Sequence, residues 1–415
     1  MDDRHLPVAL AEPPTLDLRA DFPGLTTPGG APWHYLDTAA TAQKPQAVID
    51  TVVRAMGKDY ATVHRGVYSR SADMTRSYEE ARQRISRFIG GREDEIVFTR
   101  GATEAINLVA NSWGRANLKP GDRILLSALE HHSNIIPWQM IAEATGAKID
   151  VVPLTADHRI DLDAAEKMIG PRHKLIAFVH VSNVTGSVLD VGRAADIAHS
   201  VGAKLLLDGC QAVPHMPVDV AALGCDFYVF SAHKLYGPTG IGALWASGDI
   251  LADMPPWEGG GSMIERVTFE KTTYDVPPQR FEAGTPAIVE AIGFAAAADY
   301  VDAIGREAIH AHEAALTKRL RRELGRMNDV TLFGPDDGAG IVSFLIDGIH
   351  PHDLGTILDD GDVAIRAGHH CAQPLMDYLD IPATARASFA VHSSEADIDA
   401  LIEGIGRTRR IFGKG

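Results

Sequence analysis

The sequence of 415 residues contains little cysteine and no long apolar run. Its three cysteines, Cys210, Cys225 and Cys371, are too few and too scattered to form a disulfide framework, which favours a reducing compartment. No apolar stretch is long enough to span a bilayer, and the N-terminus lacks the basic start and apolar run of a signal peptide. We therefore expect a cytoplasmic protein that does not enter a membrane.

The sequence also lacks a dense basic segment. It has 39 Lys and Arg against 55 Asp and Glu, which gives a formal net charge of -16. Such a surface repels nucleic-acid phosphates and anionic lipids, so neither is expected as a partner. With 45% hydrophobic and 23% charged residues, the composition is typical of a globular protein rather than a disordered one.

Short apolar runs alternate with segments of helical periodicity over the first two thirds of the chain. This order predicts a mainly parallel sheet with helices on both faces. A chain of this length also exceeds the usual size of one hydrophobic core, so we expect two packed units. The predicted strands lie at Ile96–Phe98, Ile124–Leu126, Ile149–Val152, Leu175–Val179, Leu205–Leu207 and Phe227–Phe230.

The two ends of the chain differ from this pattern. Residues 1–33 are rich in Pro, Gly and Asp, which predicts an irregular arm lying over the folded body. After Pro286 the pattern changes to longer helices and a smaller α+β unit. Its predicted helices span residues 288–304, 307–326 and 395–411, and its predicted strands span 341–346, 363–366 and 387–391.

Charged residues follow two of the predicted strands, where ligands of parallel sheets bind. Asp208 follows the run at 205–207, and a buried carboxylate there needs a cation such as a protonated pyridine nitrogen, which keeps the ring an electron sink. Lys234 follows the run at 227–230, where its amine can form a Schiff base with an aldehyde cofactor. Either residue alone is more simply a turn Asp or a Lys reaching solvent. Together they indicate a cofactor with an aldehyde and a pyridine ring.

A phosphate on that cofactor would need hydrogen-bond donors. Gly101, Ala102 and Thr103 lie just before a predicted helix, and backbone N–H groups at the start of a helix bind anions. Thr103 adds a hydroxyl, although it is equally plausible as an ordinary N-cap. Ser231 and His233 would close the phosphate cup.

Two adjacent histidines, His131 and His132, follow the predicted strand at 124–126. Either ring can stack on a planar cofactor and shuttle protons. Adjacent histidines also raise the question of a metal site. No further Cys or His has the spacing of a zinc ligand set, so we expect no metal.

The segment from Arg366 to Pro374 reads Arg-Ala-Gly-His-His-Cys-Ala-Gln-Pro. Cys371 lies there beside His and Arg residues, which favour a thiolate. The alternative is a small buried hydrophobic residue, which is what we expect of Cys210 and Cys225. A Cys-His protease is also conceivable, but the sequence offers no independent support for one.

Four segments together resemble the cysteine desulfurases of the aminotransferase class V group. The Arg-x-Gly-His-His-Cys-Ala pattern is similar to the SufS-type, or group II, branch of that family. The similarity runs from about Tyr35 to the C-terminus. The segments that carry it are Asp208–Gln211, Ser231–Lys234, Glu130–His132 and Arg366–Pro374.

The resemblance implies an α/β fold, that of PLP-dependent transferases of fold type I, and a homodimer. The large domain, at residues 34–290, would contain a mainly parallel seven-stranded sheet that binds pyridoxal 5'-phosphate (PLP). A smaller α+β domain at 291–415 would carry the catalytic cysteine loop. Residues 1–33 would form an arm that joins this small domain.

The resemblance also implies roles for individual residues. Lys234 would hold PLP, Asp208 would pair with the pyridine nitrogen, and His131 would stack on the ring and assist proton transfer. Arg386 would bind the substrate carboxylate, because Arg can grip a carboxylate with two hydrogen bonds. Further cofactor contacts would come from Gln211, Thr103, Ala102, Ser231, His233 and, from the other subunit, Thr285, and further substrate contacts from Asn183 and Arg366.

The implied reaction converts L-cysteine to L-alanine and leaves a persulfide on Cys371, which would supply sulfur for iron-sulfur cluster assembly in the SUF system. A small sulfur acceptor of the SufE or zinc-containing SufU kind is expected as partner. His352 is a candidate contact because imidazole binds zinc, although an ordinary residue at a helix N-terminus is at least as plausible. Cys210 stands where the family more usually has Ala, and we expect it to alter only packing.

Three alternative functions fit the same sequence. A selenocysteine lyase or a cysteine sulfinate desulfinase would share the PLP residues and differ in the leaving atom. A non-catalytic scaffold for sulfur assembly would not need Lys234, Asp208 and Cys371, whose presence argues against it.

Overall fold

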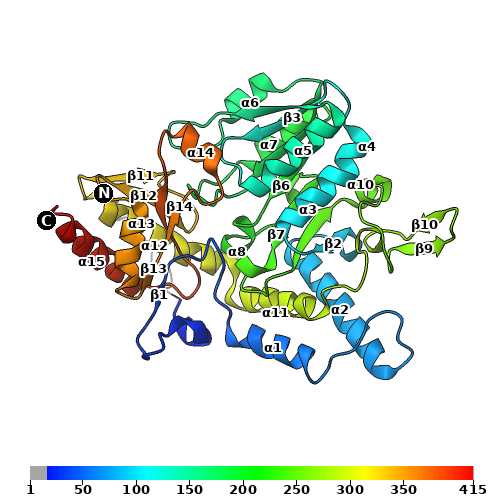
Figure 1. Ribbon diagram of the computed structural model, residues 1–415, viewed down its shortest axis with the longest axis horizontal. Coiled ribbons are helices and arrows are strands. Elements are labelled where there is room, and N and C mark those ends of the chain that lie inside the picture. The colour runs from blue at the N-terminus through cyan, green and yellow to red at the C-terminus, as the bar shows by residue number, and fades with distance from the viewer. Residues whose placement is uncertain (1–15, 415) are drawn as a thin grey trace, which may run out of the picture.

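The computed structural model describes residues 16–414 and contains two larger β-sheets lying side by side (Figure 1). The first sheet has seven strands in the order β2-β8-β7-β6-β5-β3-β4, and all its neighbours are parallel except β8, which runs antiparallel to β2 and β7. This confirms the predicted mainly parallel, seven-stranded sheet. Its strands are β2 (Ile96–Thr99), β3 (Arg123–Ser127), β4 (Lys148–Val152), β5 (His173–Val179), β6 (Lys204–Asp208), β7 (Phe227–Ser231) and β8 (Gly242–Ala246).

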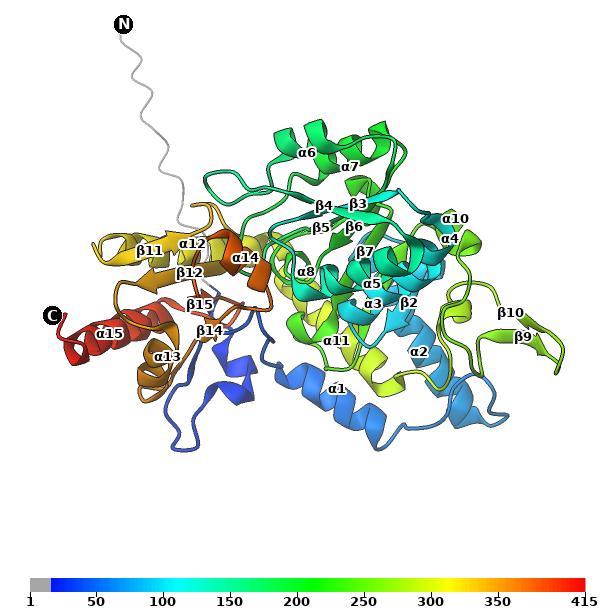
Figure 2. The same cartoon turned by 45° about the horizontal axis from the view of Figure 1, so that its top comes forward.

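Helices cover both faces of this sheet because its central strands are apolar on both sides (Figure 2). In β6, Leu205 and Leu207 pack into one core together with residues of α7 and α11, whereas Leu206 packs into the other with residues of α3 and α5. The covering helices are α1 (Gln46–Met56), α2 (Ser69–Phe88), α3 (Ala102–Val109), α5 (Ile136–Thr145), α6 (Leu162–Met168), α7 (Val191–Ser200) and α11 (Ile288–Ile304).

Shorter elements complete this part of the chain. Strand β8 has no counterpart among the predicted strands, and its first residue, Gly242, packs tightly against Gly101. A Cβ at position 242 would lie 2.6 Å from the Gly101 Cα, so only glycine allows this approach. The remaining elements are α4 (Arg115–Asn117), α8 (Ala212–His215), α9 (Val220–Leu223), α10 (Gly248–Asp253) and the hairpin β9 (Ile264–Val267) and β10 (Thr272–Tyr274).

The second larger sheet is antiparallel and is formed by the C-terminal part of the chain, in the order β11-β12-β15-β14. Leu320, Phe344 and Leu401 belong to its separate apolar core. The elements are β11 (Val330–Phe333), β12 (Ile341–Ile346), β14 (Arg366–Gly368), β15 (Thr384–Ser388), α12 (Arg306–Gly325), α13 (Pro351–Asp359), α14 (Gln373–Tyr378) and α15 (Glu395–Ile411).

The predicted strand at 363–366 is in fact two strands. Val363–Ala364 (β13) pairs in parallel with His34–Tyr35 (β1), whereas β14 pairs with β15. The predicted strand at 387–391 was also misplaced, since β15 ends at Ser388. The strand begins at Thr384, three residues before the predicted start, and just beyond its end the Phe389 N–H still donates to the Gly340 carbonyl.

The described part of the arm, residues 16–33, consists of short turns and extended chain that contact the C-terminal part. The Leu16 N–H donates to His312 Nδ1 at 3.2 Å, and Arg19 pairs with Asp397 at 3.2 Å. The first fifteen residues of the predicted arm lie outside the described residues. Within residues 16–414, no helix is long and apolar enough to cross a membrane.

Candidate active site

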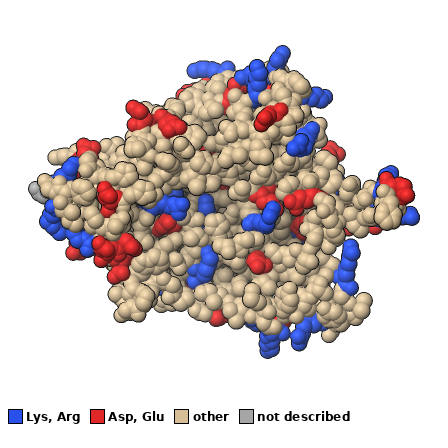
Figure 3. Space-filling view, in the orientation of Figure 1, with Lys and Arg blue, Asp and Glu red and all other residues tan. Residues whose placement is uncertain are grey.

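A cavity of about 230 Å³ lies at the carboxyl ends of β5, β6 and β7, closed on its other side by residues of β14, β15 and the loop that follows β14. Figure 3 shows Lys, Arg and acidic side chains gathered in the hollow between the two sheets. The cavity brings together every predicted site residue except Thr285: Lys234, His131, Cys371, Asp208, Gln211, Thr103, Ala102, Ser231, His233, Arg386, Asn183 and Arg366.

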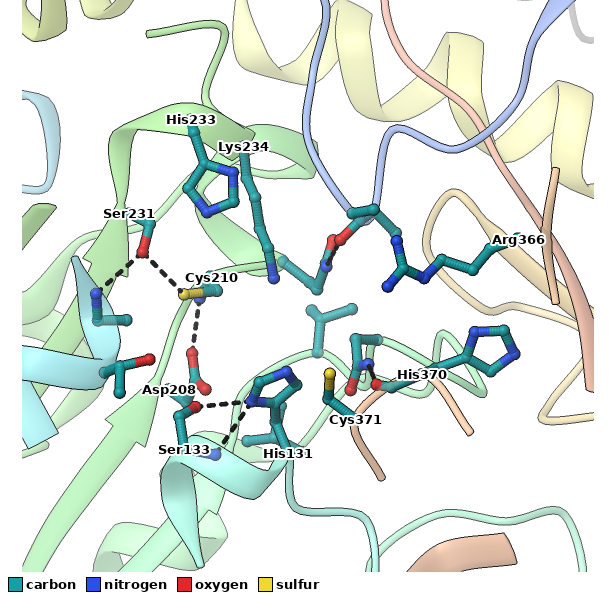
Figure 4. Close-up of a pocket in the computed structure, with 18 of the residues that line it drawn as sticks. His131, Ser133, Asp208, Cys210, Ser231, His233, Lys234, Arg366, His370 and Cys371 are labelled. Atoms are coloured by element: carbon teal, nitrogen blue, oxygen red, sulfur yellow. Dashed lines mark hydrogen bonds between the residues drawn. The ribbon is translucent and has the colours of Figure 1, made fainter. Parts of the chain in front are cut away.

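Asp208 and Lys234 project into this cavity from neighbouring strand ends (Figure 4). Asp208 is the last residue of β6 and is 4% exposed, and its Oδ1 accepts a hydrogen bond from the Cys210 N–H at 3.0 Å. Lys234 ends the single helical turn that follows β7. A carboxylate buried to this degree is stable only beside hydrogen-bond donors and positive charge. The arrangement suits a ligand that carries a cation at one end and a carbonyl near the lysine.

The start of α3 forms another wall of the cavity. The sequence predicted Thr103 to lie just before this helix. The helix in fact begins at Ala102, so Thr103 lies within its first turn. The Ala102 N–H donates to Ser231 Oγ at 2.9 Å, which leaves the Ser231 hydroxyl proton available for a ligand. Burial, together with nearby Lys234, lowers the pKa of His233 to about 4. This wall therefore offers neutral hydrogen-bond donors to an anion.

The neutral ring of His131 lies at the opposite side of the cavity from Lys234 in Figure 4. Burial first, and the charge of Lys234 second, lower its pKa to about 4. Its Nδ1 accepts from the Ser133 N–H at 3.1 Å and lies 2.7 Å from Ser133 Oγ. The neutral ring therefore carries its proton on Nε2, which suits stacking and proton exchange.

Glu130, which precedes His131, was not singled out from the sequence. Its side chain is 1% exposed, and burial raises its pKa to about 8. It lies 2.5 Å from the Ser127 hydroxyl and accepts from Asn134 Nδ2 at 2.6 Å and from the Val179 N–H at 3.1 Å. Glu130 thus ties the turn that carries the histidine to the end of β5. The sequence feature that could have indicated this role is the position of Glu130 directly before a histidine that follows a strand.

Arg386 is the buried cation of the cavity. It lies in β15 with 2% exposure, and its guanidinium donates to the Asn183 carbonyl at 2.8 Å and to Asp37 Oδ1 at 2.9 Å. Its Nε has no protein partner. Burial lowers the pKa of Arg386, and Asp37 opposes that effect. Arg366 lies 3.7 Å from the same Asp37, so two guanidinium groups and one carboxylate leave a net positive charge for an anionic substrate.

The three cysteines differ in their surroundings as the sequence suggested. Cys371 is exposed on the loop between β14 and α14 and lines the cavity. Cys210 and Cys225 are buried, and burial raises the pKa of each thiol to about 12. Only Cys371 is thus both accessible and directed at the cavity.

Thr285 is the predicted site residue that the structure does not bring to this cavity. It is exposed and lines a separate hollow of about 460 Å³ with Tyr78, Phe98 and Glu282. Its expected role was a contact from the other subunit, and that contact stays a prediction. Among the described residues, no group of three or more His, Cys, Asp or Glu side chains is placed to hold a metal ion.

The donor set fits pyridoxal phosphate. Asp208 supplies the buried carboxylate for a pyridine nitrogen, and Lys234 supplies an amine for the aldehyde. Gln211 is 2% exposed and its Oε1 has no partner within the protein, so the cavity leaves a polar atom for a bound group to satisfy. The start of α3 with Ser231 supplies donors for a phosphate.

The sequence profile of the class V aminotransferases matches residues 34–401. The chain belongs to this family. A cysteine desulfurase of Cronobacter sakazakii is 48% identical over 399 residues, which cover 95% of this chain and 98% of that protein. A cysteine desulfurase of Escherichia coli is 47% identical, with the same coverage of each chain.

Solved structures agree with this assignment. The crystal structure of the Escherichia coli cysteine desulfurase CsdA, in an S-sulfonic acid form, has a TM-score of 0.89 and 38% identity, and the match covers 95% of this chain and 98% of that one. The apo structure of a cysteine desulfurase from Thermococcus onnurineus has the same TM-score and identity, with 94% and 96% coverage. The cofactor of this class V protein is pyridoxal phosphate, which the cavity fits.

Proposed function

We propose that this protein is a PLP-dependent cysteine desulfurase that converts L-cysteine to L-alanine and collects the sulfur as a persulfide on Cys371. The observation that supports this most directly is a single cavity lined by a cofactor-holding pair, a buried guanidinium and an exposed thiol: Lys234, Asp208, Arg386 and Cys371. The cysteine desulfurases that resemble this chain over almost their whole length support the same activity.

The substrate would be held from two sides of the cavity. When bound, PLP supplies an electron sink conjugated to the substrate Cα. Arg386 would bind the substrate carboxylate through guanidinium N–H groups that are not already bonded to Asn183 and Asp37, and this contact would orient the Cα–H bond. Lys234, which lines the same cavity, would take the Cα proton with its free amine.

Cys371 would then attack the sulfur of the substrate as a thiolate. The new S–S bond forms as the substrate C–S bond breaks, and the electron pair of that bond passes to the carbon. The amine of Lys234 would return the proton that it took from Cα, and His131 would pass on the proton of the substrate thiol, so that the carbon product leaves as alanine. The sulfur stays on the exposed Cys371.

A coupled assay tests the function. The purified protein, saturated with PLP, is given L-cysteine, and alanine release is measured together with the mass of the peptide that contains Cys371. Equal initial amounts of alanine and of a peptide heavier by one sulfur atom are expected. Alanine from selenocysteine or cysteine sulfinate at a much higher kcat/KM than from cysteine would instead favour the lyase or desulfinase. No product from any of the three, with PLP bound, would favour the scaffold.

The finer assignment is a SufS-type enzyme that supplies sulfur for iron-sulfur cluster assembly in the cytoplasm. Its basis is the sequence Arg366-Ala-Gly-His-His-Cys371. We also assign a homodimer, in which Thr285 and its exposed surroundings would meet the partner subunit near the start of α3. The division into an arm at 1–33, a large domain at 34–290 and a small domain at 291–415 belongs to the same proposal. Sedimentation of the holoenzyme tests the dimer.

A small acceptor of the SufU or SufE kind would take the sulfur from Cys371. His352 is exposed near the start of α13, and its ring stacks on that of His350 with centroids 5.4 Å apart. His350 Nδ1 accepts from the His352 N–H, so the turn fixes both rings at the surface. Loss of stimulation by a zinc-containing acceptor in His352→Ala, with unchanged basal alanine release, would support the contact.

A further inference from the structure

The loop that carries Cys371 has an unfavourable backbone conformation at its centre. His370 and Cys371 both have φ of +54°, in the left-handed region that residues with a Cβ seldom adopt. Two such residues in succession persist only where surrounding contacts hold them. The loop therefore depends on contacts outside itself to keep the sulfur at the cavity.

His132 makes two of those contacts, one to Cys371 itself and one to a residue that follows it. Its backbone N–H donates to the Cys371 carbonyl at 2.8 Å, and its ring Nε2 accepts from the Gln373 N–H at 3.0 Å. On the cavity side, Asn183 Nδ2 donates to the His370 carbonyl at 2.8 Å. The polar groups before and after the thiol are thus tied to the large sheet's side of the site.

We propose that His132 is a positioning residue that latches the Cys371 loop against the cavity through the bond from the Gln373 N–H to its Nε2. The inference rests on the proposed function, which makes Cys371 the attacking group. His132 directly follows His131, so one turn fixes both the ring expected to face the cofactor and the loop that brings the thiol to it. Opening this latch would release the sulfur-bearing loop toward solvent.

The latch requires a neutral ring, because Nε2 can accept a hydrogen bond only when it carries no proton. Burial lowers the pKa of His132, and the neighbouring His369 acts in the same direction. His131, with ring centroids 6.2 Å away, is the other titratable ring beside it. At neutral pH the ring is therefore in the accepting form, with its proton on Nδ1.

The test compares two substitutions at the latch in the PLP-loaded enzyme. His132→Ala removes the acceptor, and His132→Gln places an amide oxygen where Nε2 accepts. In His132→Ala we expect iodoacetamide to alkylate Cys371 several-fold faster without substrate, and kcat for alanine release to fall by about 10- to 100-fold with little change in KM. His132→Gln should recover much of both values. His310→Ala, at an exposed helix position, is the matched control.

A second variant addresses the same bond without touching the histidine. Gln373→Pro removes the donated N–H at the first residue of α14, a position where proline is tolerated, and should change both readouts in the same direction. Wild-type alkylation and kcat in His132→Ala and Gln373→Pro would overturn the latch. The alkylation rate can be measured without turnover. If these variants speed alkylation of Cys371 but the wild type does not act on cysteine, the latch stands and only the proposed function is contradicted.

Discussion

The wall of the cavity built on the large sheet and the loop that carries Cys371 are held in opposite ways. Asp208 and Ser231 end strands that have hydrogen-bonded neighbours on both sides, and both side chains are buried. Cys371 lies on a loop with an exposed side chain and a positive φ. The groups expected to keep a fixed geometry around the cofactor thus lie on the sheet, whereas the group proposed to export sulfur lies on an exposed loop.

The two cysteines that line the cavity show the same contrast in chemical terms. Cys210 lies on the sheet wall, and burial with the nearby Asp208 raises the pKa of its thiol to about 12. Its Sγ is 3.8 Å from Ser231 Oγ. Cys371 reaches the same cavity from solvent. Position, and not residue type, therefore separates the buried thiol from the proposed nucleophile.

Replacing Lys234, which lies on the wall of the cavity built on the large sheet, should have the largest effect on turnover. Lys234→Ala would remove both the proposed covalent attachment of the cofactor and the amine proposed to take the Cα proton, so alanine formation should fall by about 1,000-fold or more. The visible absorption of the bound cofactor should shift as well. Lys167→Ala, an exposed lysine, serves as control. Near-normal turnover in Lys234→Ala would refute the assignment.

The two cysteines of the cavity allow a matched test of whether the thiol on the loop, and not the one on the sheet wall, carries the persulfide. In Cys371→Ala the protein-bound persulfide should disappear while PLP stays bound, because the attacking sulfur is lost and the sheet wall is intact. Cys210→Ala should keep the persulfide, since its buried thiol stays protonated and only donates a weak hydrogen bond to Ser231 Oγ. Mass spectrometry of the intact proteins after one turnover measures both. A persulfide retained in the first variant and lost in the second would reverse the roles.

Part of this architecture could be predicted from the sequence, and part could not. The central strands were evident because they are apolar on both faces. Strand β15 was misplaced because Thr384, Arg386 and Ser388 give it a polar face, which is buried in the structure. Asp37 was missed because its partner Arg386 lies 349 positions away in the sequence, and only the fold brings the two together.

The site could be predicted where its residues follow apolar runs or lie in family motifs. His132 and Glu130 belong to the same motif as His131, but their roles depend on which backbone groups they meet. Those partners, in the Cys371 loop and at the end of β5, lie far away in sequence. Local patterns identify residue types with chemical potential, and only the fold shows which of them serve to orient others.

The two guanidinium groups near Asp37 provide a smaller test, which compares a buried with an exposed contact. Arg386→Lys removes the planar fork that bonds Asn183 and Asp37, so the KM for cysteine should rise by roughly 10- to 100-fold. Arg366→Lys should have a smaller effect, because the Arg366 side chain is 44% exposed and screened by water. Steady-state kinetics measures both, and equal effects would contradict the buried site as the main carboxylate contact.

The smallest predicted effect concerns the loss of folding stability at acid pH and the buried residue His180. The backbone N–H of His180 donates to the Asp208 carbonyl, and its ring Nδ1 lies 3.0 Å from the Tyr228 hydroxyl. Burial lowers the pKa of His180 from 6.5 to about 4. Between these pH values the unfolded chain binds a proton that the folded chain does not. This difference lowers stability by about 2 kcal/mol at pH 5 relative to pH 7. His180→Asn cannot titrate, so its melting temperature should fall less than that of the wild type between pH 7 and 5, whereas the two should change equally between pH 7 and 8. Parallel curves over the whole range would show that this histidine does not contribute to the acid sensitivity of the wall.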